Sequence, residues 1–254
     1  MNERPRRWIL VCLGCGVLLA GAADSDGAAG REPDGRMADA LRTSAGEMAG
    51  AGPIESDLER VDYSSCLPCH GEDGRGSRAV FAPPLAGQKR WYLDRQVEHF
   101  RLAVRGAHPE DVYGGMMIPM ARAVEQTEQR QEVLDEIAEF EPRRPESVLE
   151  GDVDLGREIF EERCASCHGD HAEGNREEGA PRLDILPDWY IVRQLRNFQA
   201  GFRGELEADE HGRQMRPVAL SLTDPQRMEA VAAYIHRQYG KSGGGEVERT
   251  SDVR

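Results

Sequence analysis

Two strings decide how this chain is interpreted: Cys66-Leu67-Pro68-Cys69-His70 and Cys164-Ala165-Ser166-Cys167-His168. Each has the pattern Cys-x-x-Cys-His, which is the attachment signature of a c-type haem. Two thiols that are three residues apart on a local turn reach the two vinyl groups of one porphyrin, and the adjacent histidine presents a ring nitrogen to the iron. The sequence therefore predicts two covalently bound haem c groups, attached through Cys66, Cys69, Cys164 and Cys167, with His70 and His168 as axial ligands.

The two strings belong to a longer repeat. When the first half of the chain is shifted by 98 positions, identical residues coincide without a gap on the C-terminal side of the strings. This self-similarity indicates an internal duplication in which each copy forms one domain. The coinciding residues include Pro83 and Pro181, Trp91-Tyr92 and Trp189-Tyr190, Arg95-Gln96 and Arg193-Gln194, Phe100 and Phe198, Arg105-Gly106 and Arg203-Gly204, and Met117 and Met215.

The repeat also selects the second axial ligand of each iron. A low-spin electron carrier fills this position with methionine or histidine, and methionine raises the reduction potential. The first copy offers Met116, Met117 and Met120, but only Met117 has a methionine, Met215, at the matching position of the second copy. We therefore expect Met117 and Met215 to bind the irons. Met228 lies in a helical pattern and is expected in the core.

The other histidines do not recur between the copies, so surface or helix-capping roles are expected for them; they are His99, His108, His171, His211 and His236. Two rival interpretations of the cysteines are a four-cysteine zinc site and a thiol–disulfide exchanger. The zinc site does not explain the histidine after each pair or the repeated methionine. The exchanger lacks the expected alternation of strands and helices.

Apolar periodicity predicts an all-helical chain. Helices are expected over 91–104, 128–140, 156–164, 189–202 and 224–239, with glycine- and proline-rich loops between them and no strands. The segment Glu141-Pro142-Arg143-Arg144-Pro145 is a good linker. It separates a first domain over 57–141 from a second over 146–240.

The ends of the chain are predicted to lie outside these domains. Residues 1–22 resemble an export signal, with a basic start, an apolar run and the cleavage pattern Ala20-Gly21-Ala22. A retained membrane anchor and lipidation at Cys15 are the alternatives. A flexible linker over 23–56 and a disordered tail over 241–254 are also expected. The protein is thus predicted to be periplasmic, with the signal removed.

The chain is acidic, with a formal net charge of −14. Loss of residues 1–22 would remove three arginines and one glutamate, which changes the charge to −16. Such a charge argues against binding nucleic acid, and it favours fast encounters with basic protein partners. The alternative is that the acidic residues only keep the protein soluble.

The chain resembles the cytochrome c4 family over roughly residues 58–240. The family consists of tandem dihaem proteins, so the resemblance implies two class I cytochrome c domains with His/Met irons. It also implies that the carbonyls of Pro83 and Pro181 accept the second ring N–H of the axial histidines. The resemblance is carried by Cys66-Leu67-Pro68-Cys69-His70-Gly71-Glu72-Asp73-Gly74, Pro84-Leu85-Ala86-Gly87-Gln88 and Met215-Arg216-Pro217-Val218-Ala219-Leu220-Ser221-Leu222-Thr223-Asp224.

One departure concerns the helix that leads into each string. Gly156 and Phe160 fit the first-helix pattern of class I domains, whereas the first copy has Leu58 and Asp62 at the matching positions. The first helix of the first domain is therefore expected to be shortened or packed differently.

These observations predict an exported dihaem electron carrier of a respiratory chain and not an enzyme, because both axial positions of each iron are filled. Its expected partners are redox proteins, such as a terminal oxidase, a quinol-oxidising complex or a dehydrogenase. Three alternatives remain open: a haem subunit of a dehydrogenase complex such as a sulfide-oxidising flavocytochrome, a donor docked to a terminal oxidase with peripheral membrane association, and a dihaem peroxidase.

Overall fold

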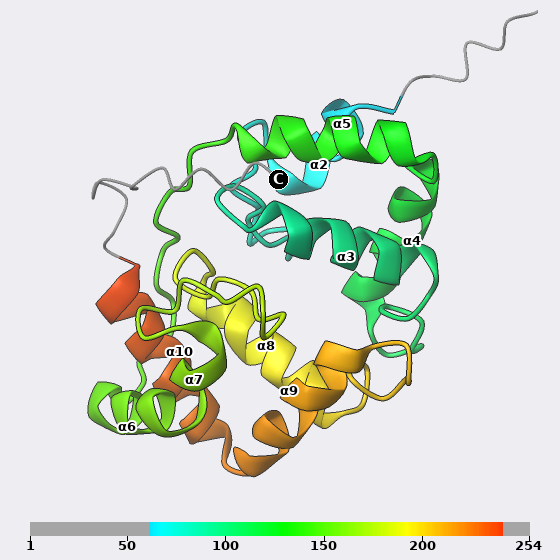
Figure 1. The fold of residues 1–254 in the computed structure, drawn as a ribbon. Helices are drawn as coiled ribbons and strands as arrows, with labels where there is room; N and C mark the ends of the chain where they lie inside the picture. The colour runs from blue at the N-terminus through cyan, green and yellow to red at the C-terminus, as the bar shows by residue number, and fades with distance from the viewer. Residues whose placement is uncertain (1–60, 241–254) are drawn as a thin grey trace, which may run out of the picture. The chain divides into compact units, whose positions relative to one another are not determined.

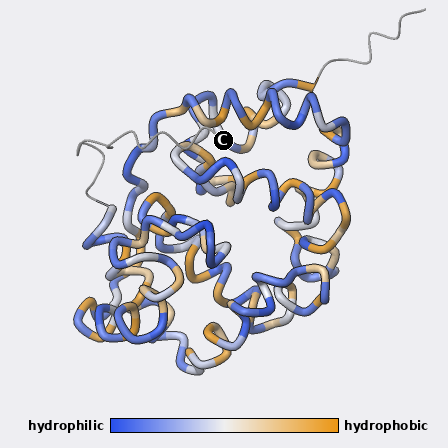
Figure 2. The backbone as a smooth tube through the Cα atoms, viewed as in Figure 1, coloured by the Kyte–Doolittle hydropathy of each residue, from blue (hydrophilic) through white to orange (hydrophobic). Residues whose placement is uncertain are grey.

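The computed structural model describes residues 61–240, and the predicted signal, linker and tail lie outside this range. The described residues form helices joined by loops, with no sheet among them, so the all-α prediction is confirmed (Figure 1). Their hydropathy alternates along the helices, as amphipathic elements require (Figure 2). The first half contains η2 (Tyr63–Ser65), α2 (Leu67–His70), α3 (Arg90–Arg101), α4 (Val112–Ala123) and α5 (Thr127–Ala138). The second contains α6 (Val153–Arg163), α7 (Ala165–His168), α8 (Asp188–Gln199), α9 (Glu210–Ser221) and α10 (Pro225–Tyr239).

The helices repeat in the same register as the sequence. The starts of α2, α3, α4 and α5 lie 98 positions before those of α7, α8, α9 and α10. The prediction of loops between the expected helices is wrong for α4 and α9, which carry Met117 and Met215. Pro119 and Pro217 lie inside these helices, and proline usually marks a helix end, which explains the error.

The second half has the larger apolar core. Eighteen buried residues form one cluster in it, against six in the first half, counted among the described residues. Helix α6 crosses α10 closely because Gly156 has no side chain: a Cβ there would overlap the carbonyl oxygen of Ala230 and come within 2.7 Å of the Cβ of Tyr234. Met228 is buried in this core, as expected.

The first half enters its string differently, as the departure in the sequence predicts. Asp62 is the N-cap of the short 3-10 helix η2 and accepts a hydrogen bond from the Ser64 amide. The matching stretch of the second half is the end of α6, which continues as far as Arg163. Leu58 lies outside the described residues.

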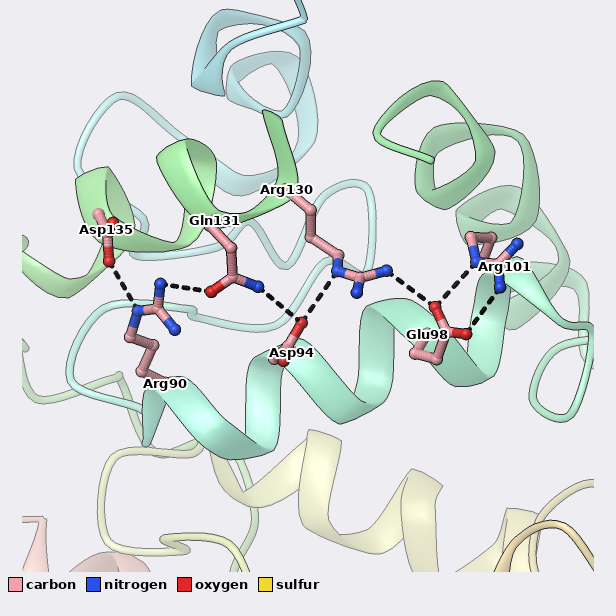
Figure 3. A network of polar contacts seen from close by, with 7 residues as sticks. All are labelled: Arg90, Asp94, Glu98, Arg101, Arg130, Gln131 and Asp135. Carbon is pink, nitrogen blue, oxygen red and sulfur yellow. Dashed lines mark hydrogen bonds and ion pairs between the residues drawn. The ribbon is translucent and has the colours of Figure 1, made fainter. Parts of the chain in front are cut away.

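A ladder of polar contacts joins α3 to α5 in the first half (Figure 3). For example, the Arg130 guanidinium pairs with Asp94 at 2.9 Å and with Glu98 at 2.8 Å. The matching second-half positions of Asp94 and Arg130 are Val192 and Met228, which are buried in its core. The acidic partners of Arg130 are partly exposed, and ion pairs near the surface contribute about 0–1 kcal/mol each, whereas a buried apolar side chain contributes about 1.5–3 kcal/mol. The first half is therefore held together less strongly by its own side chains.

The linker and the residues that follow it are bound to helices α8 and α10 of the second half. The buried carboxylate of Asp188 accepts hydrogen bonds from the Ser147 hydroxyl and from the amides of Val148 and Leu149. His236 is also buried, and its ring bonds to the Pro145 carbonyl at 2.7 Å. The expected surface or capping role of His236 is therefore wrong. Helix α10 is covered by α6, by α8 and by the linker, so a polar side chain there needs a buried partner.

Substitution of Gly156 by alanine is expected to lower the free energy of unfolding of the second half by about 1–3 kcal/mol, because the added Cβ forces α6 away from α10. Thermal unfolding of the purified protein measures this change. Gly115→Ala in α4 is the control. Its Cβ would meet nothing nearer than 3.5 Å, so the melting temperature should be unchanged or slightly higher. An unaltered melting temperature for Gly156→Ala would contradict the close crossing.

Candidate haem sites

Each Cys-x-x-Cys-His string is wound into one short helix, α2 or α7. The histidine is the last residue of that helix, and a glycine follows it with a positive φ, 80° at Gly71 and 83° at Gly169. Only glycine adopts this conformation without strain, so the chain can turn away directly after the histidine. The two cysteines and the histidine of each string are thus presented from one turn of backbone.

The second string lies at a cavity of the second half. The cavity has about 1160 Å³ of empty volume, including its opening to solvent, and its lining is mostly apolar. Ligand pockets are concave and mostly apolar with a few polar groups, and this lining has the same character. Its lining brings together the predicted site residues Cys164, Cys167, His168, Pro181 and Met215.

A cavity of about 1020 Å³ lies beside the first string. Cys69, His70, Pro83 and Met117 line it, together with Met116. Cys66 does not line it; its side chain packs against the apolar cluster around Tyr63 and Leu134. The two strings therefore line two separate cavities, which does not match a single metal site built from four cysteines.

Both string histidines are buried and oriented by a proline carbonyl. The Nδ1–H of His70 donates to the carbonyl oxygen of Pro83 at 2.9 Å, and that of His168 donates to Pro181 at 2.9 Å. A carbonyl only accepts, so Nδ1 carries the proton and Nε2 keeps the lone pair that a metal needs. Burial lowers the pKa of both histidines, and the hydrogen bond offsets part of this shift. The imidazoles are therefore neutral at pH 7, the form that binds a metal.

The first cysteine of each string is the more buried one. Burial raises the pKa of Cys66 to about 11 and that of Cys164 to about 12. Both sulfurs are thus protonated thiols at neutral pH. The structure records Cys66, Cys69, Cys164 and Cys167 as free cysteines, so none is used in a disulfide.

Two buried arginines lie between the cavities. Arg105 donates to Gln96, Gln194 and the Tyr190 hydroxyl, while Arg203 donates to the same two glutamines. Within residues 61–240 neither guanidinium forms an ion pair, and the Nε of each has no hydrogen-bond partner. A buried charge without a counter-ion is energetically unfavourable, so we expect these two arginines to bind an anionic group.

The carboxylates of haem meet this requirement, and the apolar cavities, neutral histidines and paired thiols suit the rest of the group. The predicted site residues did not include these arginines. The signal was nevertheless present in the sequence, because Arg105 and Arg203 coincide in the repeat.

Comparison with known proteins agrees with this geometry. The family model described as cytochrome c matches residues 153–238. Cytochrome c4 of Thiocapsa roseopersicina is 30% identical over 182 residues, which cover 67% of this chain and 85% of that protein. The thiosulfate dehydrogenase electron acceptor of Thiomonas intermedia (strain K12) is 29% identical over 207 residues, covering 76% of this chain and 87% of the relative.

A solved structure gives the same result. The cytochrome c4 of Acidithiobacillus ferrooxidans superposes with a TM-score of 0.57 at 27% identity, over 68% of this chain and 98% of that one. The likeness extends over both halves of the repeat, since the second half alone would be a smaller share of the chain. The chain therefore belongs to the cytochrome c4 family, as an electron carrier of respiratory chains with two covalently bound haem c groups.

Proposed function

We propose that each half holds one haem in the cavity beside its string, with histidine and methionine as the two iron ligands. The cavity linings support this assignment, because each contains a string histidine and a methionine from the helix that matches in the other half. The proposed residues are Cys66, Cys69, His70 and Met117 in the first half, and Cys164, Cys167, His168 and Met215 in the second.

Each bound haem supplies a site that takes up and releases one electron. The remaining work belongs to the protein. Pro83 and Pro181 hold the histidine rings in one orientation and one tautomer. The buried guanidiniums of Arg105 and Arg203 would neutralise the carboxylates of the haems. The largely apolar lining of each cavity would tune the potential of the haem through its low polarity.

With both ligand positions filled, neither half leaves a metal position for a substrate, so we propose that the protein transfers electrons and catalyses no reaction of its own. This proposal depends on one observation: a methionine lines each of the two cavities. A peroxidase would need one iron whose ligand is missing or displaced, and the two halves are equivalent in this respect.

The proposed partners are redox proteins met in the periplasm after export. No helix in residues 61–240 is long and apolar enough to cross a membrane. The acidic composition favours a basic docking face on the partner. A second candidate role, electron acceptor of a dehydrogenase complex, is supported by the relative named as a thiosulfate dehydrogenase electron acceptor.

The test is ligand access to the reduced irons. We expect the purified, dithionite-reduced protein to contain two covalent haems by mass and to show no change in its absorption spectrum under carbon monoxide, since methionine and histidine occupy both sites. Rapid carbon monoxide binding at either iron would contradict the proposed ligands. Peroxide consumption with a reduced donor would instead support the peroxidase.

A further inference from the structure

Several of the contacts between the two halves are reciprocal, although others, such as those of Gln88 with Arg182, occur once. Two kinds of hydrogen bond occur twice. In each case the donor and the acceptor of the second bond lie 98 positions from those of the first, with the halves exchanged. An arginine of each half donates to a backbone carbonyl of the other, and a second arginine donates to a glutamine of the other. The pairs are Arg95 with Gly179 and Arg193 with Phe81, and then Arg105 with Gln194 and Arg203 with Gln96.

A third pair of contacts is related by the same shift of 98 positions, but one residue of the pair differs between the halves. The Asn197 amide donates to Asp111 of the first half at 3.4 Å. At the matching place His99 of the first half faces Asp209 of the second, with 3.6 Å between Nδ1 and Oδ1. An amide does not titrate, whereas an imidazole gains a charge in the pH range of many cells. At 3.6 Å the neutral ring makes no ordinary hydrogen bond, but the protonated ring forms an ion pair.

Asp209 connects this contact to the second cavity. It is the N-cap of α9, where its carboxylate accepts hydrogen bonds from the Gly212 amide at 3.0 Å and the Gly204 amide at 3.1 Å. Helix α9 carries Met215, and Asp209 itself lines the cavity that contains Met215 and His168. A change of charge at His99 therefore acts on the wall of the second cavity and on the start of the helix that carries the proposed ligand.

His99 and Asp209 are largely shielded from solvent, so water and salt would screen the charge of a protonated His99 only weakly. Its side chain is 12% exposed and that of Asp209 is 6% exposed. Burial lowers the pKa of His99, Asp209 raises it, and the nearby guanidiniums lower it further, so the ring is neutral at pH 7 and is protonated in more acidic solution. The charged groups that face it are Asp209, Arg95, Arg203 and Arg105.

We propose that His99, acting through Asp209, couples the binding of one proton to the binding of one electron in the second half, and that Asn197 leaves the first half without this coupling. The inference rests on the proposed function. When the second half gains an electron, its cavity loses one positive charge, so the imidazole binds one proton from solvent more tightly; oxidation returns that proton to solvent. By linkage, protonated His99 favours the reduced state to the same extent.

The test uses the full holoprotein in spectroelectrochemical titrations between about pH 4 and pH 8, a range that extends below the usual titration of histidine because burial lowers the pKa of His99. In the unmodified protein the midpoint potential of the second-half haem should fall as pH rises through the titration of His99 and then level off. His99→Asn, which copies the second half's own residue, should abolish this step and spare the first-half haem. The haem carboxylates are present in both proteins, so they cannot account for the difference. Equal pH profiles in the two proteins would overturn the proposal.

Two further measurements test the coupling between His99 and the second-half haem. Asn197→His should give the first-half haem a pH-dependent step that it otherwise lacks, and no new step would count against the coupling. In the unmodified protein, nuclear magnetic resonance should find that His99 titrates at higher pH in the reduced state than in the oxidised state. The same titration in both states would refute the coupling without any variant. Missing covalent haem or carbon monoxide binding would instead refute the proposed function.

Discussion

Replacement of Met215 by histidine is expected to lower the midpoint potential of one haem by on the order of a few tenths of a volt, because the identity of axial ligands sets haem potentials over a range of about 0.8 V. Methionine raises the potential relative to histidine. The other haem should keep its potential, since its proposed ligands line a different cavity. Met117→His should lower the potential of the first-half haem and leave that of the second-half haem unchanged. Optical redox titration of each variant resolves the two potentials.

Met116 supplies the matched control. It lies next to Met117 in α4 and lines the first cavity, but its side chain is half exposed and has Gln214 at the matching place in the repeat. Met116→His should therefore leave both potentials close to those of the unmodified protein. A drop in potential for Met116→His, together with none for Met117→His, would move the proposed ligand by one residue.

Removal of the two cysteines of the first string should damage folding more than removal of the second pair. Without its haem, the described part of the first half has an apolar cluster of six buried residues and the α3–α5 polar ladder to hold its helices together. The second half keeps a cluster of eighteen residues and the close crossing of α6 with α10. Below a certain apolar area, buried side chains do not offset the conformational entropy lost on folding. We expect Cys66→Ala with Cys69→Ala to unfold the first half.

Hydrogen exchange followed by mass spectrometry of peptides separates these outcomes. In the first-string variant, peptides from α3 and α5 should exchange as fast as those of an unfolded chain. In the Cys164→Ala, Cys167→Ala variant, peptides from α6 and α10 should keep measurable protection. Each variant should still carry one covalent haem by mass, which controls for a general failure of attachment. Equal loss of protection in the two variants would mean that the difference in core size has no effect on stability.

The fold class and the cofactor could be predicted from the sequence because the informative residues are local. The thiols and the histidine of a string lie within five residues, and the repeat register relates one methionine in each half. Amphipathic helices such as α3 and α10 also appear as apolar periodicity. The structure adds the hydrogen bond from each string histidine to a proline carbonyl, at the position that the family resemblance implies.

Other features depend on contacts between distant residues. Helices α4 and α9 contain a proline and neighbouring glycine or polar residues, so their local pattern does not indicate a helix. The burial of His236 depends on the linker that passes over α10, and sequence periodicity carries no information about that linker. Two of the three partners of Arg105, Tyr190 and Gln194, lie 85 and 89 residues away in the other half, so the repeat marks the residue without indicating these partners.

The reciprocal contacts between the halves also bear on the origin of the protein. When residue i of one partner meets residue j of the other, and j meets i in return, the surface is isologous, as in a twofold-symmetric dimer. Arg95 with Gly179 and Arg193 with Phe81 satisfy this relation within a single chain. An ancestral single-haem domain that associated with its own copy would leave this arrangement once two gene copies were fused. In these contacts the two halves face each other as the subunits of a twofold-symmetric dimer do, and the histidine at position 99 is a place where that symmetry is broken.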